Sequence, residues 1–382
     1  MDFIPVNRPL LHKDDFKLLK EAFTSGWISS SGKYIEMFEE EWANYCQRKY
    51  GVAVSNGTTA LQIAVESIGI KSGDEVIMPS YTIISCAQAI IRAGAKPIFV
   101  DSDPDTWCIN PNLIEDKINS STKAIMIVHI FGHPVDMDPI FNIASKYNLK
   151  IIEDAAEVHG AQYLSGRGTS SEKWIACGSM GDVSTFSFFA NKLITTGEGG
   201  MVLTDDEEVY ENLKSLRNLC FIPERRFLHN ELGHQFRLTN MQAAIGINQI
   251  KRMEHIIQRK RDIAARYNKR FAGINKIKLP IEKYWAKSVF WVYSILLNDS
   301  INMDASELAE LLRLKNIETR PFFLGMHEQP VLRKMGLASS ENYPVCEKIS
   351  RKGLYLPCGV GTTNSEIEYV SDTVVEILDE IK

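Results

Sequence analysis

Short, continuous apolar runs alternate with helical stretches between residues 50 and 205. The runs that we expect to form strands are 51–54, 75–78, 97–100, 124–128, 150–152, 183–186 and 201–203. Continuous rather than alternating apolar residues are typical of strands covered on both faces. Because helical segments such as 58–68 and 139–147 separate several of the runs, the pattern predicts an open, largely parallel sheet with crossover helices.

A different pattern begins near Leu238. Apolar residues recur at helical spacing from Met241 to Phe271, which predicts a long helix of the kind that often bridges two domains. Beyond it, one segment alternates like a strand and two more are helical; these are 288–297, 305–315 and 367–381. We therefore expect a large domain over residues 1–251 and a smaller C-terminal α+β domain over residues 252–382.

Charge and cysteine usage argue against several classes of partner and site. The net charge is -5, and the one dense basic stretch, at 258–261, is interpreted as a solvated helix face. We therefore expect neither nucleic acid nor a membrane as a partner.

The seven cysteines form no Cys-x-x-Cys pair, which favours reduced thiols over disulfides or a metal site. Because no signal peptide and no apolar run near ~20 residues is evident, we expect a cytoplasmic protein.

A turn through glycine joins the first apolar run to a helix in Val54-Ser-Asn-Gly-Thr-Thr-Ala-Leu61. Gly57 allows a ligand to approach the backbone closely, and the N–H of Thr58 has no intrahelical acceptor. Such a helix start can bind a phosphate, with the Thr58 hydroxyl as a further donor. It can also be an ordinary helix start capped by Ser or Asn, and the segment alone leaves both interpretations open.

Acidic residues follow the apolar run at 150–152. Asp154 falls at the carboxyl end of a predicted strand, the edge at which open α/β sheets bind ligands. A carboxylate there needs a cationic partner, such as a protonated pyridine nitrogen, although Asp154 would also cap the next helix. Glu157 either lines the same site or faces solvent on the first helical turn. His159 is interpreted as a packed or capping residue rather than a catalytic one.

Lys192 lies between an aromatic run and the glycine-rich turn Gly197-Glu-Gly-Gly200. A partly desolvated lysine has a lowered pKa, so its neutral amine can attack a carbonyl and form a Schiff base. Ser187 offers a further donor to a phosphate. The glycines by themselves indicate only a tight turn between strands. The order of phosphate loop, acid and lysine, each at a strand end, predicts a pyridoxal phosphate site.

These segments together resemble those of the nucleotide-sugar aminotransferases of the aspartate-aminotransferase fold. The similarity runs nearly end to end and includes residues 26–34, 99–103, 129–134, 237–245 and 317–322. It implies the α/β fold of pyridoxal-phosphate-dependent transferases, with a mainly parallel central sheet and the cofactor on the large domain. A related dehydratase branch carries His at the lysine position, so Lys192 argues against that branch.

The resemblance also implies a role for each candidate residue. Lys192 would bind pyridoxal 5'-phosphate covalently and transfer protons, Asp154 would pair with the pyridine nitrogen, and Glu157 would lie near the ring hydroxyl. The phosphate would be held by Gly57, Thr58 and Ser187. A homodimer with shared active sites is implied as well, because in this family the second subunit completes each site.

Three features depart from the family pattern. Gln235 stands where the second subunit usually contributes an Asn, so a longer amide would contact the phosphate. Ile83 stands where relatives commonly carry an aromatic residue that stacks on the cofactor ring, and the loop 165–177 is longer than expected. Arg320 and His327 are candidate substrate-binding residues, because the segment around them approaches the substrate in relatives.

The implied activity is transfer of an amino group from glutamate to the keto carbon of a nucleotide-linked 4-keto-6-deoxy sugar. The branch with the most similar motifs converts GDP-4-keto-6-deoxymannose to GDP-perosamine for polysaccharide biosynthesis. Another keto-sugar nucleotide or a small phosphorylated ketone stays open as the acceptor. A non-enzymatic pyridoxal-phosphate-binding sensor is a remote alternative, since it would ordinarily carry a basic DNA-binding segment that this sequence lacks.

Overall fold

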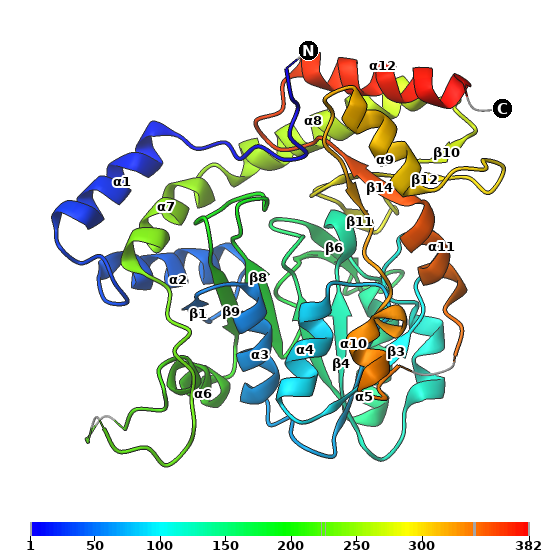
Figure 1. Ribbon diagram of the computed structural model, residues 1–382. Coiled ribbons are helices and arrows are strands. Elements are labelled where there is room, and N and C mark those ends of the chain that lie inside the picture. The colour runs from blue at the N-terminus through cyan, green and yellow to red at the C-terminus, as the bar shows by residue number, and fades with distance from the viewer. Residues whose placement is uncertain (1, 223, 226, 339–340, 381–382) are drawn as a thin grey trace.

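A seven-stranded sheet forms the centre of the computed structural model, which describes residues 2–222, 224–225, 227–338 and 341–380 (Figure 1). The strand order is β1-β9-β8-β5-β4-β2-β3. The strands are β1 (Tyr50–Val54), β2 (Glu75–Pro79), β3 (Lys96–Val100), β4 (Thr122–Val128), β5 (Lys150–Asp154), β8 (Val183–Ser187) and β9 (Gly200–Thr204). In this sheet β9 runs opposite to the other six strands, which share one direction. The largely parallel sheet predicted from the apolar runs is therefore confirmed.

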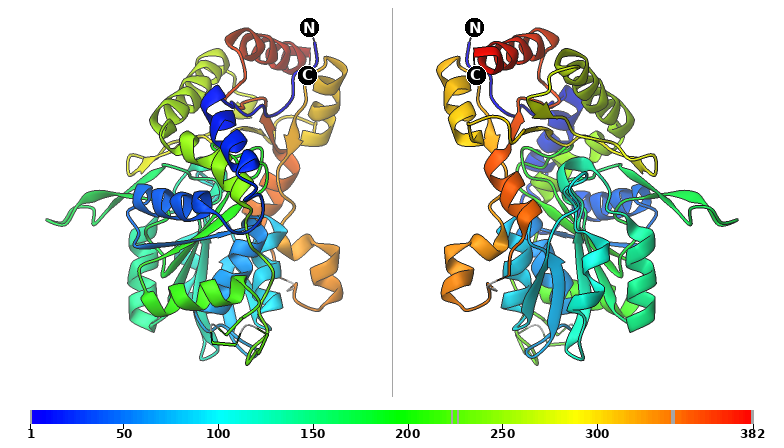
Figure 2. Two further views of the ribbon diagram at one scale, coloured as in Figure 1. Left: turned by 90° about the vertical axis from the view of Figure 1, so that its left-hand side faces the viewer. Right: turned by 90° about the vertical axis from the view of Figure 1, so that its right-hand side faces the viewer.

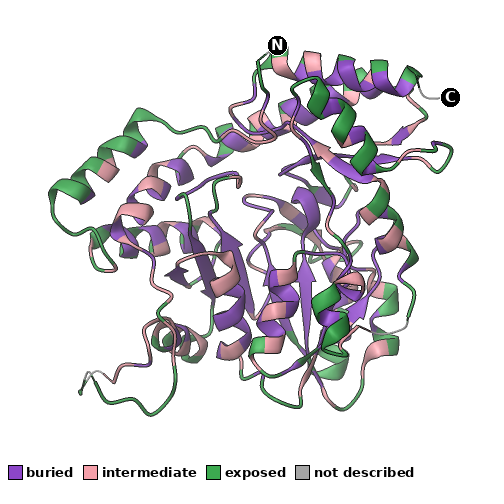
Figure 3. Cartoon of the chain, in the orientation of Figure 1, coloured by how far each residue is buried: buried purple, intermediate pink, exposed green. Residues whose placement is uncertain are grey.

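Helices cover this sheet and leave a buried core between the layers (Figure 3). In the first part of the chain the helices are α1 (Lys13–Thr24), α2 (Lys33–Tyr45), α3 (Gly57–Ser67), α4 (Ile84–Arg92), α5 (Met137–Tyr147) and α6 (Glu207–Arg217). Helices α3, α4 and α6 lie side by side over one face (Figure 1). Single 3-10 turns occur at Pro111–Leu113, Glu115–Lys117, Ile130–Gly132 and Met326–Glu328. Among the described residues, no helix combines the length and apolar character that a membrane crossing requires.

The segment 165–177, expected to be a long loop, forms most of a β-hairpin instead. Strands β6 (Gln162–Ser165) and β7 (Lys173–Ala176) pair antiparallel, and β11 (Ala286–Lys287) adds a third strand beside β6. Arg167 fixes the base of the turn, because its guanidinium pairs with the carboxylates of Asp136 and Asp138. The hairpin projects from the body of the molecule (Figure 2).

The single long helix predicted from Met241 onward is wrong, because the helix breaks at residues 251–252. It is divided into α7 (Asn240–Ile250) and α8 (Met253–Phe271). At the break, the guanidinium of Arg252 lies 2.8 Å from the buried carboxylate of Asp15 on α1. The bend lets α7 pack against α1 and α2, whereas α8 packs against the last helix, α12 (Asn364–Glu380).

A second sheet, of four antiparallel strands, lies in the C-terminal part. Its order is β10-β12-β14-β13, formed by Ile277–Lys278, Tyr293–Leu297, Gly353–Leu356 and Arg320–Pro321. The remaining helices are α9 (Ala305–Leu314), α10 (Pro330–Lys334) and α11 (Pro344–Lys352). The chain start joins this part, since the N–H of Ile4 donates to Asn316 O at 2.9 Å. The division at residues 251 and 252 stays a prediction.

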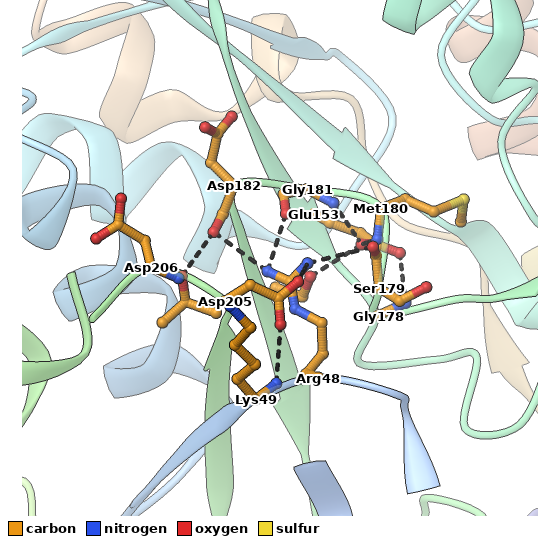
Figure 4. Close-up of polar contacts among 12 residues, drawn as sticks. Arg48, Lys49, Glu153, Gly178, Ser179, Met180, Gly181, Asp182, Asp205 and Asp206 are labelled. Atoms are coloured by element: carbon orange, nitrogen blue, oxygen red, sulfur yellow. Dashed lines mark hydrogen bonds and ion pairs between the residues drawn. The ribbon is translucent and has the colours of Figure 1, made fainter. Parts of the chain in front are cut away.

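Two buried charges of opposite sign hold the turn that leads into β8 (Figure 4). The carboxylate of Glu153, fully buried on β5, accepts hydrogen bonds from His129 Nε2, Ser184 Oγ and the N–H groups of Gly178, Met180 and Gly181. From the other side, Arg48 donates to the carbonyls of Ser179, Gly181 and Asp182. Because β8 follows directly, this clamp fixes the strand whose end forms part of the candidate site.

Candidate active site

A cavity of about 690 Å³ opens where the parallel strands end and helices α3 and α4 begin. Asp154 is the last residue of β5, and Ser187 is the last residue of β8. Six of the seven residues predicted to bind the cofactor line this one cavity: Gly57, Thr58, Asp154, Glu157, Ser187 and Lys192. The structure therefore brings the predicted phosphate loop, acid and lysine together at the edge of the sheet that ligands prefer.

The start of α3 forms an anion cradle in this cavity. Asn56 caps the helix by accepting the N–H of Thr59 at 2.9 Å, while the N–H groups of Gly57 and Thr58 have no acceptor among the described residues. The hydroxyl of Thr58 lies 2.9 Å from that of Ser85. A Cβ added to Gly57 would lie 2.8 Å from the Cβ of Ser187, so only glycine allows this approach. Both interpretations of the segment hold, because the cap leaves two donors free for a phosphate.

Asp154 is a buried carboxylate that lacks a close cationic partner among the residues that the structure describes. Its Oδ1 accepts the N–H of Ala156 at 3.1 Å, and its Oδ2 accepts the Cys86 thiol at 3.2 Å. Burial raises the pKa of Asp154, and the hydrogen bonds and the charge of Lys192 act in the opposite direction. A pyridinium nitrogen placed against this carboxylate would supply the missing positive charge.

Lys192 lies in a buried pocket with one acid and one aromatic ring beside its amine. Its Nζ is 4.0 Å from Oε1 of Glu157 and 3.7 Å from the ring centroid of Trp291. Burial lowers the pKa of Lys192, and the carboxylates of Glu157 and Asp154 oppose that shift. Burial also raises the pKa of Glu157 to about 7, although Lys192 and the N–H of Phe131, which donates at 2.7 Å, act against it. Burial therefore shifts the Lys192 amine toward its neutral, nucleophilic form.

His159 is a packed residue, as expected. It is fully buried, and its ring lies 5.3 to 5.5 Å from the rings of Trp42, Phe186 and Phe188. Burial lowers the pKa of His159 to about 3, with the charge of Lys192 acting in the same direction. The neutral imidazole therefore contributes to the aromatic layer beneath the lysine rather than to proton transfer at the cavity.

Three predicted site residues do not line the cavity of their own chain. Gln235 is exposed and forms a bridge with Asn218. Arg320 is also exposed and pairs with Glu318 at 2.6 Å. His327 is buried, and its Nδ1 lies 2.7 Å from the Ser80 hydroxyl, so it anchors its segment to the end of β2.

The cavity also has walls that the sequence analysis did not identify. Helix α4 contributes Ser85, Gln88 and Arg92, whose helical spacing places them on one face and was a usable signal. Segments distant in the chain contribute Trp291, Phe323 and Tyr355, which no local sequence pattern marks as part of the site. Ile83, singled out as a departure from the family pattern, lines the cavity at the start of α4 and is 44% exposed.

The fold and this arrangement of anion cradle, acid and lysine define a pyridoxal-phosphate-dependent transferase. The chain matches the DegT/DnrJ/EryC1/StrS aminotransferase family over residues 9–375 and belongs to that family. It is therefore an aminotransferase that uses pyridoxal phosphate.

Known relatives cover almost the whole chain. GDP-perosamine synthase of Escherichia coli O157:H7 is 39% identical over 376 residues, which are 98% of this chain and 99% of the relative. The synthase of Caulobacter vibrioides is 38% identical, with 99% and 98% covered. Among solved structures, DesV of S. venezuelae is 30% identical with a TM-score of 0.90, and all of both chains is covered. The resemblance to the nucleotide-sugar aminotransferases seen in the sequence motifs is confirmed.

Substituting Glu157 tests how its environment shifts its ionisation. In the cofactor-free protein, Glu157 takes up its proton more readily than in the unfolded chain, so the free energy of unfolding should fall as pH rises from about 4.5 to 7. Glu157→Gln should remove roughly 3 kcal/mol of this pH dependence, measured by urea denaturation. Glu198→Gln, which alters an exposed carboxylate of the same cavity, is the control and should follow the wild type. Parallel pH profiles for wild type and Glu157→Gln would contradict the assignment.

Proposed function

We propose that this aminotransferase transfers the amino group of glutamate to GDP-4-keto-6-deoxymannose and forms GDP-perosamine for polysaccharide biosynthesis. The observation that carries the proposal is the grouping of the cradle, Asp154 and Lys192 in one cavity, in a chain 39% identical to a GDP-perosamine synthase over nearly its full length. All seven cysteines are free and buried, in keeping with a cytoplasmic location.

The residues of the cavity would divide the work between holding the cofactor and transferring protons. When bound, pyridoxal phosphate supplies a carbonyl that accepts the amino group and a ring that withdraws electrons. The N–H groups of Gly57 and Thr58, with the hydroxyl of Ser187, would hold the phosphate, and Asp154 would keep the ring nitrogen protonated. The Lys192 amine would move the proton at the reacting carbon, with Glu157 Oε1 4.0 Å away to stabilise its charged form.

Another acceptor is the second candidate, and Ile83 is the residue that favours it. Its aliphatic side chain lines the cavity and is 44% exposed at the position where relatives commonly present an aromatic ring. An aliphatic contact is less polarisable and leaves more room, so a different keto-sugar nucleotide or a small phosphorylated ketone would fit.

A homodimer with shared sites is part of the proposal. Large apolar side chains are exposed along α1 and the segment after it: Phe16 64%, Phe23 64%, Trp27 61% and Ile28 48%. Several large exposed apolar side chains on one short segment are typical of a protein interface. Gln235 is exposed outside its own cavity, as a residue that serves the partner's cofactor would be.

Acceptor preference tests the substrate. The protein in its amino form should aminate GDP-4-keto-6-deoxymannose with a kcat/KM at least ~100-fold above that for the dTDP- or UDP-linked 4-keto-6-deoxyglucose, since several lost contacts are involved. Single-turnover product formation, followed by mass, is the measurement. Lys192→Ala is the negative control. Equal rates, or a preference for another nucleotide, would contradict the proposed acceptor but not the aminotransferase activity.

Mixed dimers test whether Gln235 acts on the partner's site. Gln235→Glu should strongly weaken cofactor binding, because it places a carboxylate against a phosphate. When Lys192→Ala and Gln235→Glu subunits are refolded together in equal amounts, about half of the dimers contain one subunit of each kind. If Gln235 serves the neighbouring subunit, one of the two sites in each mixed dimer has both native residues, which is about a quarter of all sites. If Gln235 serves its own subunit, no site has both. Recovery of about one quarter of wild-type activity is expected. Activity that stays at the level of the separate variants would contradict a shared site.

A further inference from the structure

Trp291 makes two separate contacts with the lysine turn. The Lys192 Nζ lies over its ring, 3.7 Å from the centroid. Its indole N–H donates to the carbonyl of Asn191 at 2.8 Å, and the side-chain amide of Asn7 donates to the same carbonyl at 3.1 Å. Trp291 itself is only 4% exposed. One side chain therefore holds both the reactive amine and the backbone beside it.

The backbone before Trp291 is strained, which explains why the predicted strand 288–297 begins only at Tyr293. Phe290 has a φ of 46°, a left-handed conformation that is costly for a bulky residue. Hydrogen bonds enforce it, since the N–H of Val289 and the hydroxyl of Ser288 both donate to Gly132 O. A Cβ on Gly132 would lie 2.5 Å from the backbone nitrogen of Trp291, so only glycine fits at this position. The left-handed conformation of Phe290 keeps Trp291 out of the strand, and the Trp291 side chain lines the cavity.

We propose that Trp291 is a positioning residue, whose indole face holds the Lys192 ammonium whenever that amine is not bonded to the cofactor. A tryptophan face attracts a cation through its quadrupole, and the attraction strengthens where water is excluded. The amine then keeps a fixed position in the cavity between Trp291 and Glu157, where it would be available to give or take a proton. The inference rests on the proposed role of Lys192 as the cofactor-binding lysine.

Other charged or titratable groups near the amine act on it as well. Glu157 and Asp154, from β5 and the turn after it, favour the charged amine, and His159 lies behind the same turn. Glu198 and Tyr355 line the cavity from β9's preceding turn and from β14. These groups are unchanged in a Trp291 variant, so their effects cancel when variants are compared.

The pH dependence of cofactor capture tests the proposal. Only the neutral amine attacks the cofactor, so the rate at which the cofactor-free protein develops visible absorbance with pyridoxal phosphate falls on the acid side. Loss of the indole face makes the ammonium less stable, and Trp291→Leu should move the acid-side midpoint about one pH unit lower. Trp291→Phe, with a weaker face, should move it in the same direction by less. Ionisation of free pyridoxal phosphate is common to all samples and does not affect the difference.

Two controls separate this role from a packing role and from failure of the proposed function. Trp285→Leu removes another buried tryptophan, one that contacts His133 and Tyr163, and should leave the midpoint unchanged. A reduced maximal rate with an unmoved midpoint in Trp291→Leu would overturn the proposal. If that variant does not fold, Trp291→Phe decides by the same criterion. If Lys192→Ala develops the same absorbance as wild type, the lysine assignment itself fails, whatever the midpoints show.

Discussion

Burial of the Lys192 amine is the constraint on which the rest of the site depends. A lysine that has lost its water is reactive because its charged form is destabilised, but a fully uncompensated charge would not be tolerated in a folded chain. Glu157 at 4.0 Å and the Trp291 ring at 3.7 Å compensate part of the loss. Both the charged and the neutral form of the amine are therefore accessible. Schiff-base formation requires the neutral form, and proton transfer requires both.

The sheet supplies the positions for this balance. Parallel strands β5 and β8 end side by side, so Asp154 and Ser187 lie at one edge although 32 residues of sequence separate the ends of their strands. The buried Glu153 clamp, one residue before Asp154, fixes the turn into β8 (Figure 4). Helix α3 begins at the same edge and presents its free N–H groups. Asp154 and Ser187 are thus placed by the hydrogen bonds between paired strands.

Those parts of the fold and site that depend on local pattern could be predicted from the sequence. Asp154 ends a strand, and Lys192 and the Gly57 turn each follow one, and each of these strands is specified by its own apolar residues. The break at Arg252 could not be predicted, because it depends on an ion pair with Asp15 in a distant helix. Trp291 was also missed, because an alternating apolar run predicts a strand and only the distant carbonyl of Gly132 forces the chain out of it.

Covalent trapping on Lys192 tests the central claim most directly. The protein loaded with pyridoxal phosphate would be reduced with borohydride and digested, and the modified peptide would be identified by mass spectrometry. The account predicts a phosphopyridoxyl group on Lys192 at close to one per chain. Modification of another lysine, such as the buried Lys260, or no stable modification at all, would contradict it.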